Sequence, residues 1–203
     1  MSSDKDSLKE YDQPLIETDN FFVVSAIGQF IKGYLLICSK SHFLNMGSLD
    51  TSIFDEFIEV KERVRKLLYD VYEISPIFFE HGAARIKNRA GTCVDHAHLH
   101  AVPIEIHDAK VFSSIYFCKE IPATPESVIS FSKTGNPYFF LEISDRRMYL
   151  FDALLLPCQF GRRVLAQLVH LNNHWNWRKY PFESNAINTT RKLQEWIGSS
   201  DGK

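Results

Sequence analysis

Three histidines alternate with small or apolar residues in residues 95–103, and this pattern constrains the fold more than any other in the chain. Strict period-two alternation predicts a β-strand, because successive side chains of a strand point to opposite faces. His96, His98 and His100 therefore share one face, with neighbours roughly 6–7 Å apart. The alanines and leucine between them suit a core. The segment predicts a strand with a row of imidazoles on one side and an apolar underside.

A row of imidazoles permits three interpretations. A solvated strand face that is histidine-rich by chance is disfavoured, because histidine is neither a strong strand former nor common on open faces. Imidazoles two residues apart can ligate a metal ion such as zinc. Alternatively, one imidazole acts as a nucleophile, while its neighbours and nearby backbone fix its tautomer and bind the leaving group.

Composition bounds the class of protein. A chain of 203 residues with 45% hydrophobic residues can form one large domain with a real core. Its net charge of -2 is scattered, which argues against a nucleic-acid partner held by bulk electrostatics. Four widely spaced cysteines predict free thiols in a reducing compartment. Neither a signal segment nor an apolar run of ~20 residues is visible, so we expect a cytoplasmic protein with no membrane partner.

The order of apolar segments predicts an α+β domain. Apolar runs at 21–27 and 34–38 predict a hairpin, and residues 51–72 have the spacing of an amphipathic helix that packs on a sheet. A strand at 76–82 precedes the histidine strand, which is expected to run on to residue 106. This order predicts an antiparallel sheet with a packed helix.

We divide the chain into three parts: a mobile arm at 1–14, a domain at 15–107, and a C-terminal α/β extension at 108–203 that packs on the same domain. Within the extension, a hairpin is expected around 138–151. The remaining expectations are a loop at 121–125 and helices at 159–171 and roughly 186–197.

The segment from His96 to Val102 resembles the signature of the histidine triad family, in which three histidines alternate with hydrophobic residues. The upstream segments Gly33-Tyr34-Leu35-Leu36-Ile37 and Lys40-Ser41-His42 resemble that family's second strand and the turn after it. The resemblance covers residues 15–107 and implies a histidine-triad-like fold, an antiparallel sheet with a packed helix.

The resemblance also implies an activity, cleavage of phosphoanhydride or phosphoramidate bonds of nucleotides by a hydrolase or nucleotidyl transferase that commonly dimerises. Dinucleoside polyphosphates and nucleoside phosphoramidates are the implied substrates, and no cofactor is implied. His98 would attack the α-phosphate and form a nucleotidyl-histidine intermediate. His100 would contact the phosphate or protonate the leaving group, and His96 would hold the other ring nitrogen of His98, largely through its backbone carbonyl.

The chemistry of imidazole agrees with these roles. With an unperturbed pKa of ~6.5, an imidazole is mostly neutral near pH 7 and is a competent nucleophile. Its second nitrogen must be held by an acceptor, so that the attacking nitrogen carries the lone pair. The phosphoryl oxygens need donors nearby to disperse their charge.

The sequence departs from the family pattern at several positions. Tyr34 stands where many members have another histidine, and Glu80 followed by His81 stands where they have an asparagine or glutamine. Cys93, beside Thr92, takes the place of a serine or threonine. For the ribose-binding position the nearest polar residue is Ser25, and the extension offers Gln159 and Arg163. The candidate substrate-binding residues are therefore Ser25, Tyr34, Glu80, His81, Thr92, Cys93, Gln159 and Arg163.

Gln159 and Arg163 lie four residues apart, on one face of the predicted helix and near its N-terminus, which favours anions. We expect this helix to fold back over the histidines and supply both side chains to the phosphates, the alternative being a solvated helix face. Phe22 and Ile27 either sandwich a base or belong to the core. Trp177 either packs the extension onto the domain or stacks on a base.

Two rival functions remain open. A metal-dependent hydrolase would use His96, His98 and His100 as ligands, with Glu80 or His81 as a further ligand. A catalytically weak nucleotide-sensing module would keep the fold, and the departures at Tyr34 and Glu80 are the features that favour it.

Overall fold

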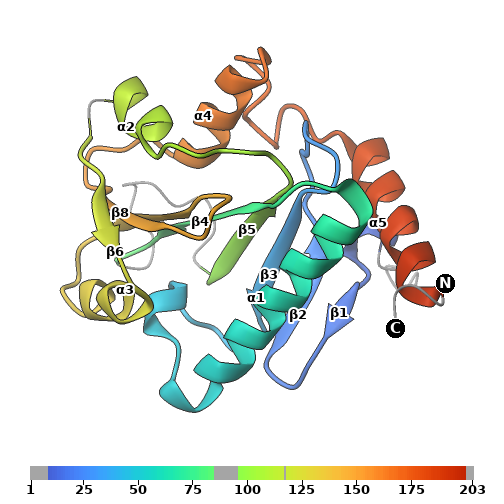
Figure 1. The fold of residues 1–203 in the computed structure, drawn as a ribbon, viewed down its shortest axis with the longest axis horizontal. Coiled ribbons are helices and arrows are strands. Elements are labelled where there is room, and N and C mark those ends of the chain that lie inside the picture. Colours follow the sequence, from blue (N-terminus) through green and yellow to red (C-terminus); the bar gives the residue numbers. More distant parts are fainter. Residues whose placement is uncertain (1–8, 85–95, 117, 200–203) are drawn as a thin grey trace, which may run out of the picture.

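A computed structural model describes residues 9–84, 96–116 and 118–199, and its centre is a wholly antiparallel sheet with helices on both faces (Figure 1). The strand order is β1-β2-β3-β5-β4-β7-β8-β6. The strands are β1 (Ile16–Glu17), β2 (Phe21–Ser25), β3 (Leu35–Ser39), β4 (Ile77–Gly82), β5 (His98–Val102), β6 (Ile121–Ala123), β7 (Tyr138–Glu142) and β8 (Met148–Asp152). The helices are α1 (Thr51–Tyr72), α2 (Lys110–Tyr116), α3 (Pro125–Ser132), α4 (Phe160–Leu168) and α5 (Glu183–Gly198), with short 3-10 turns η1 (Glu10–Asp12) and η2 (Met46–Ser48). The predicted α+β class is confirmed.

The histidine strand β5 lies inside the sheet, between β3 and β4. His100 is opposite Leu36 on one side and Phe79 on the other. The predicted alternation holds, because Ala97, Leu99 and Ala101 are all buried. The strand is shorter than expected, since it begins at His98 and ends at Val102. The residue before it, Ala97, donates its amide to the Phe43 carbonyl (2.7 Å) in a loop, which explains why regular pairing starts only afterwards.

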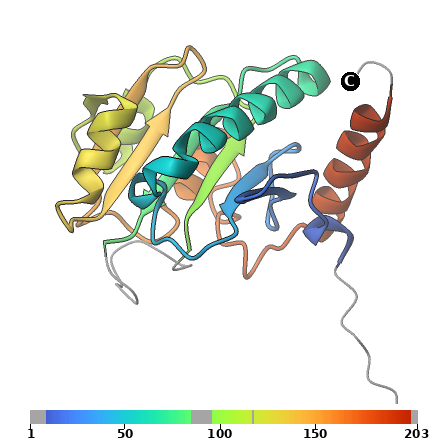
Figure 2. The ribbon, with the colours of Figure 1, turned by 90° about the horizontal axis from the view of Figure 1, so that it is seen from below.

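One face of the sheet is covered by α1, whose residues Phe57, Val60, Val64 and Leu68 are buried at helical spacing (Figure 2). The predicted bounds of this helix are confirmed. Val128 of α3 and Leu193 of α5 join the same core. α5 packs on β2 and η1.

The opposite face is only partly covered. α2 and α4 contact each other, and α4 lies on β4. Phe112 of α2 and Phe160, Val164 and Leu165 of α4 form a second core with Phe139 of β7. On this face Phe22 and Val24 of β2, Leu36 of β3, and His98 and His100 of β5 stay half-buried, so the sheet is open there.

The C-terminal extension continues the sheet. β7 pairs with β4 along its length, from Phe78 opposite Glu142 to Gly82 opposite Tyr138. The hairpin expected around 138–151 is present as β7 and β8. The loop expected at 121–125 is wrong, because residues 121–123 pair with β8 as an edge strand and α3 begins at Pro125.

The structure describes residues 9–14 of the segment expected to be a mobile arm. Residues 9–14 include η1, in which Tyr11 is buried. Glu10 accepts two hydrogen bonds from Arg191, and Glu183 accepts one from Lys9. These contacts with α5 hold the segment to the domain. Residues 1–8 lie outside the described ranges.

Two further expectations concern the surroundings of the protein. In the described ranges, no helix is both long and apolar enough to cross a membrane. Cys38 and Cys118 are free thiols, as expected. Cys158 is disulfide-bonded, which contradicts the expectation for that residue.

A buried ion cluster joins α1 to the extension. Lys61 and Arg65 of α1 both donate to the carboxylate of Glu142, at the end of β7. All three side chains are almost fully buried, and the Arg65 guanidinium also lies over the Phe78 ring, 4.6 Å from its centroid. Since a buried charge is tolerable only when it is paired, the cluster couples the two parts of the chain.

Replacing Glu142 by alanine should destabilise the protein by about 3–5 kcal/mol, because Lys61 and Arg65 would remain buried without their partner. Urea denaturation measures this change. Asp145→Ala, which removes a carboxylate from an exposed ion pair with Arg147, should cost at most about 1 kcal/mol. Equal costs for the two variants would contradict the coupling.

Candidate functional site

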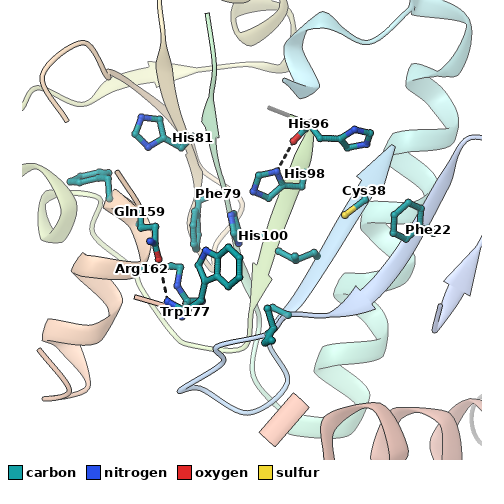
Figure 3. A pocket seen from close by; sticks show the side chains of 15 residues that line it. Phe22, Cys38, Phe79, His81, His96, His98, His100, Gln159, Arg162 and Trp177 are labelled. Carbon is teal, nitrogen blue, oxygen red and sulfur yellow. Dashed lines mark hydrogen bonds between the residues drawn. The ribbon is translucent and has the colours of Figure 1, made fainter. Parts of the chain in front are cut away.

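The open part of the sheet forms a pocket of about 320 Å³ beneath α4 (Figure 3). All three predicted histidines line it, as do Phe22 and Ile27. The lining comprises Phe22, Ala26, Ile27, Leu36, Cys38, Phe79, His81, His96, His98, His100, Gln159, Phe160, Gly161, Arg162 and Trp177. The pocket therefore combines residues of four strands with residues of the C-terminal extension.

His98 has its tautomer fixed by the backbone. Its Nδ1 lies 2.6 Å from the carbonyl oxygen of His96. A carbonyl only accepts, so Nδ1 carries the proton and Nε2 carries the lone pair. The predicted hydrogen bond between these two residues is confirmed. His98 thus presents an unprotonated ring nitrogen, the form that a nucleophile requires.

The His96 ring is itself held by β3. Its Nε2 donates to the carbonyl oxygen of Ser39 at 2.6 Å, and the His42 ring packs edge-on against it at 5.5 Å. The backbone carbonyl that holds His98 is therefore anchored from its own side chain. This anchoring occurs just before β5 begins.

His100 is enclosed by two aromatic rings. Phe79 stacks on it with centroids 4.5 Å apart and planes 13° apart. Tyr34, which is fully buried, places its hydroxyl 2.9 Å from Nδ1 of His100. The ring centroids of His98 and His100 are 4.8 Å apart, so both imidazoles can reach the same ligand.

Burial shifts the imidazole pKa values downward. It lowers the pKa of His98, although the hydrogen bond to His96 opposes the shift. Burial lowers the pKa of His100 well below its usual range, and the neighbouring His98 and Arg162 add to the effect. Removal from water disfavours the charged form. Both rings are therefore neutral near pH 7.

His81, at the end of β4, faces the same pocket, and its ring nitrogens have no hydrogen-bond partner among the described residues. Neither of its ring nitrogens contacts water or finds a hydrogen bond within the described structure. Burial, and then His98, lowers its pKa to about 4. A buried imidazole without partners costs free energy unless a ligand satisfies it.

The extension supplies the other wall of the pocket, but not with the expected pair. Gln159 lines the pocket, and its Oε1 accepts from the Trp177 amide at 3.4 Å. Arg163 does not line it, since its guanidinium donates to the Cys158 carbonyl and lies over the Trp175 ring. The neighbouring Arg162 lines the pocket instead. The cause is that Gln159 lies outside the helix, with φ of 58°, so the assumed helical spacing does not apply.

Two predicted substrate-binding residues lie on the wrong face. Glu80 points toward α1, where its carboxylate accepts from the Tyr138 hydroxyl (2.6 Å) and the Met46 amide (2.7 Å). Strand alternation puts Phe79 and His81 on the pocket side, and therefore Glu80 on the other. Ser25 is buried against α5 and bonded to the Thr190 hydroxyl. Neither residue can reach a ligand in the pocket.

Tyr34 needs a milder correction. It lies behind His100 and does not line the pocket, so it acts on a ligand only through that ring. Thr92 and Cys93, also predicted to bind substrate, lie outside the described residues.

The arrangement of the histidines bears on the metal interpretation. Nδ1 of His98 and Nε2 of His96 are both engaged by carbonyl oxygens, so these nitrogens cannot ligate a metal. Among the residues that the structure describes, no three His, Cys, Asp or Glu side chains are grouped to hold a metal ion. The geometry favours the nucleophile interpretation.

Seven pocket residues were not singled out as binding residues from the sequence: Ala26, Leu36, Cys38, Phe79, Phe160, Gly161 and Arg162. Phe79 could have been found, because it alternates with His81 on one strand. Arg162 could not, because its position depends on where α4 begins. Burial raises the pKa of the Cys38 thiol to about 12, so it is a packing residue rather than a reactive one.

Comparison with known proteins gives a consistent but distant picture. No family model matches the sequence, and no curated protein matches it. A hypothetical histidine triad nucleotide-binding protein from Sulfolobus tokodaii is 22% identical to this chain. The match covers 47% of this chain and 62% of that protein, with a TM-score of 0.39.

Two other solved structures match at similar levels. A Hit-like protein involved in cell-cycle regulation from Bartonella henselae, with an unknown ligand, is 18% identical (60% of this chain, 82% of that one, TM-score 0.38). A Zn-bound histidine triad family protein from Mycobacterium smegmatis is 21% identical (61% and 87%, TM-score 0.37). All three are histidine triad proteins. Overlaps of this extent carry no information on activity, which has to be argued from the pocket residues.

The pKa of His81 makes a prediction about stability. Between pH 4 and about 6.5 the unfolded chain protonates His81 and the folded protein does not, so stability rises with pH across this window. Acidification from pH 7 to 5 should therefore stabilise His81→Phe relative to wild type by about 2 kcal/mol. Urea denaturation at both pH values measures the difference.

Glu80 provides a matched control of opposite sign. Burial raises its pKa to about 7, so the folded protein holds a proton that the unfolded chain releases above about pH 4.3. Its contribution to stability is present below that pH and is lost as the pH rises through about 7. Wild type should gain stability relative to Glu80→Gln on acidification. The same sign for both variants would contradict these pKa assignments.

Proposed function

We propose that the protein is a nucleotide hydrolase or nucleotidyl transferase that works through a covalent nucleotidyl intermediate on His98. The observation that carries the proposal is the 2.6 Å hydrogen bond from Nδ1 of His98 to the His96 carbonyl. It leaves the lone pair of Nε2 free in a pocket shared with His100. The lowered pKa of His98 keeps that lone pair unprotonated near pH 7.

In the first step, Nε2 of His98 attacks the α-phosphorus. A bond from nitrogen to phosphorus forms, and the bond to the leaving group breaks and takes its electron pair with it. A phosphate leaving group departs as an anion, and an amine takes a proton from water. The His98 ring then carries positive charge, which the His96 carbonyl at Nδ1 stabilises.

In the second step, water or another acceptor attacks the phosphorus. The bond between nitrogen and phosphorus breaks, its electrons return to Nε2, and the proton of the attacking group passes to solvent. His98 is restored in its starting tautomer, because the hydrogen bond to His96 persists throughout. Dividing the displacement in two is the usual advantage of covalent catalysis.

The lining of the pocket supports an orientation for the substrate. Phe22 lies on one side of the histidines (Figure 3), and the apolar lining of the pocket also includes Ile27, Leu36 and, from the extension, Trp177. These suit a nucleobase, which stacks on aromatic faces. On the other side lie His81 and Gln159, whose polar groups suit the leaving group. The homodimer implied by the family resemblance stays a prediction.

Incubating wild-type protein with adenosine 5′-phosphoramidate or a diadenosine polyphosphate in the presence of EDTA should give an acid-labile adenylyl adduct, detected by mass spectrometry. His98→Ala should form none and should lose turnover by about a thousandfold or more.

His107→Ala is the matched control, because it removes an exposed histidine remote from the pocket lining. It should form the adduct as wild type does. An adduct in His98→Ala would contradict the assigned nucleophile. Binding without any adduct in wild type would favour the nucleotide-sensing module, and adduct formation that EDTA abolishes would favour the metal-dependent hydrolase.

Trp177→Ala should raise KM for the same nucleotide by about tenfold to a hundredfold with little change in kcat, because stacking on a base contributes about 1–3 kcal/mol. A uniform loss of binding raises KM alone. Trp175→Ala is the control, since that ring packs on Arg163 and does not line the pocket. Steady-state kinetics distinguish them, and similar KM values for Trp177→Ala and wild type would place the base elsewhere.

A further inference from the structure

Tyr34 contacts both His100 and Arg162 at the edge of the pocket. The Tyr34 hydroxyl is 2.9 Å from Nδ1 of His100. Burial raises the pKa of Tyr34, and the positive charge of the nearby Arg162 opposes that rise. Tyr34 is fully buried and Arg162 almost so. The proposed mechanism has used neither residue.

Arg162 is fixed in place by backbone groups. Its Nε donates to the Trp175 carbonyl at 2.8 Å, and its Nη2 donates to the Gly28 carbonyl. The guanidinium also lies over the rings of Phe30 and Tyr34, at 5.2 and 5.5 Å from their centroids. Its position against the Tyr34 ring is therefore set by the fold and does not depend on a ligand.

The available donors and acceptors determine the direction of the hydrogen bond between Tyr34 and His100. The Arg162 guanidinium, which lies 5.5 Å from the Tyr34 ring centroid, only donates, so it cannot take the hydroxyl proton of Tyr34. The hydroxyl has one proton, and among the described residues Nδ1 of His100 is the only acceptor within reach. Were Nδ1 of His100 to carry a proton instead, the buried hydroxyl proton of Tyr34 would have no acceptor, which is costly. The favoured arrangement has Tyr34 donating to Nδ1.

We infer that Tyr34, packed against Arg162, is a positioning residue that holds His100 with its proton on Nε2, so that His100 presents a hydrogen-bond donor to the phosphate. This inference rests on the proposed function for the identity of the ligand. The two imidazoles then have opposite polarity: His98 offers a lone pair at Nε2, and His100 offers a proton at Nε2.

The opposite polarity has a chemical consequence. Negative charge builds up on the phosphoryl oxygens as His98 attacks, and a fixed donor at that point stabilises the transition state more than the ground state. A lone pair on Nε2 of His100 would repel the same oxygens. The stack with Phe79 and the bond to Tyr34 leave the ring no freedom to choose its orientation at the moment of reaction.

The test is ¹⁵N NMR of histidine-labelled protein, in which protonated and unprotonated ring nitrogens have well separated shifts. His100, assigned with His100→Asn, should show a protonated Nε2 in wild type. In Tyr34→Phe, which removes only the hydroxyl, the proton should be shared between the two nitrogens. With adenosine 5′-phosphoramidate, kcat of this variant should fall about tenfold to a hundredfold, below the loss expected for deleting a donor outright, while KM changes less than about threefold.

Tyr138→Phe is the matched control, because it also removes a buried phenolic hydroxyl, on the other face of the sheet. It should leave the His100 tautomer and kcat unchanged, which separates the proposed effect from a general loss of stability. A wild-type His100 protonated on Nδ1 would overturn the inference, as would an unchanged tautomer in Tyr34→Phe. The NMR result stands even if wild type turns over no nucleotide, so the two proposals can fail separately.

Discussion

The pairing of β5 with β3 on one side and β4 on the other is the constraint on which the pocket depends. Leu99 and Ala101 are buried against α1, so the strand cannot slip by one residue without exchanging them for histidines in the core. The same register places Phe79 beside His100 and Cys38 beside His98. Hydrophobic burial on one face therefore fixes the chemistry presented on the other.

The C-terminal extension, although distant in sequence from the histidine strand, forms the remaining wall of the pocket. β7 and β8 lengthen the sheet beyond β4, and the apolar contacts of Phe160 hold α4 on their surface. Gly161 is needed at this approach, because a Cβ there would lie 2.5 Å from the Phe79 ring. Arg162 then ties the wall to the loop at Gly28. One short segment thus seals the second core, bounds the pocket and packs against the Tyr34 ring.

Local periodicity predicted most of the fold, because amphipathic spacing alone determines α1, the first hairpin and the hairpin of β7 and β8. Periodicity failed where contacts with residues distant in the sequence determine the local structure. β5 starts late because the Phe43 carbonyl takes the Ala97 amide. Glu80 was assigned to the pocket because the sequence does not reveal which face of β4 aligns with the histidines. Arg163 was chosen over its neighbour because the left-handed conformation of Gln159 is invisible in the sequence.

The protonation states of the pocket residues bear on how an anionic ligand would affect His98. Burial keeps the rings of His98, His100 and His81 neutral. Arg162 is the one cationic residue among the described lining residues, and its guanidinium is bonded to backbone carbonyls. A phosphate anion entering the pocket raises the pKa of each imidazole, because an opposite charge favours the protonated form. A nucleophile with an ordinary pKa would then be protonated by the arrival of its own substrate. In the proposed mechanism, the lowered pKa of His98 opposes this rise and favours the neutral ring that the attack requires.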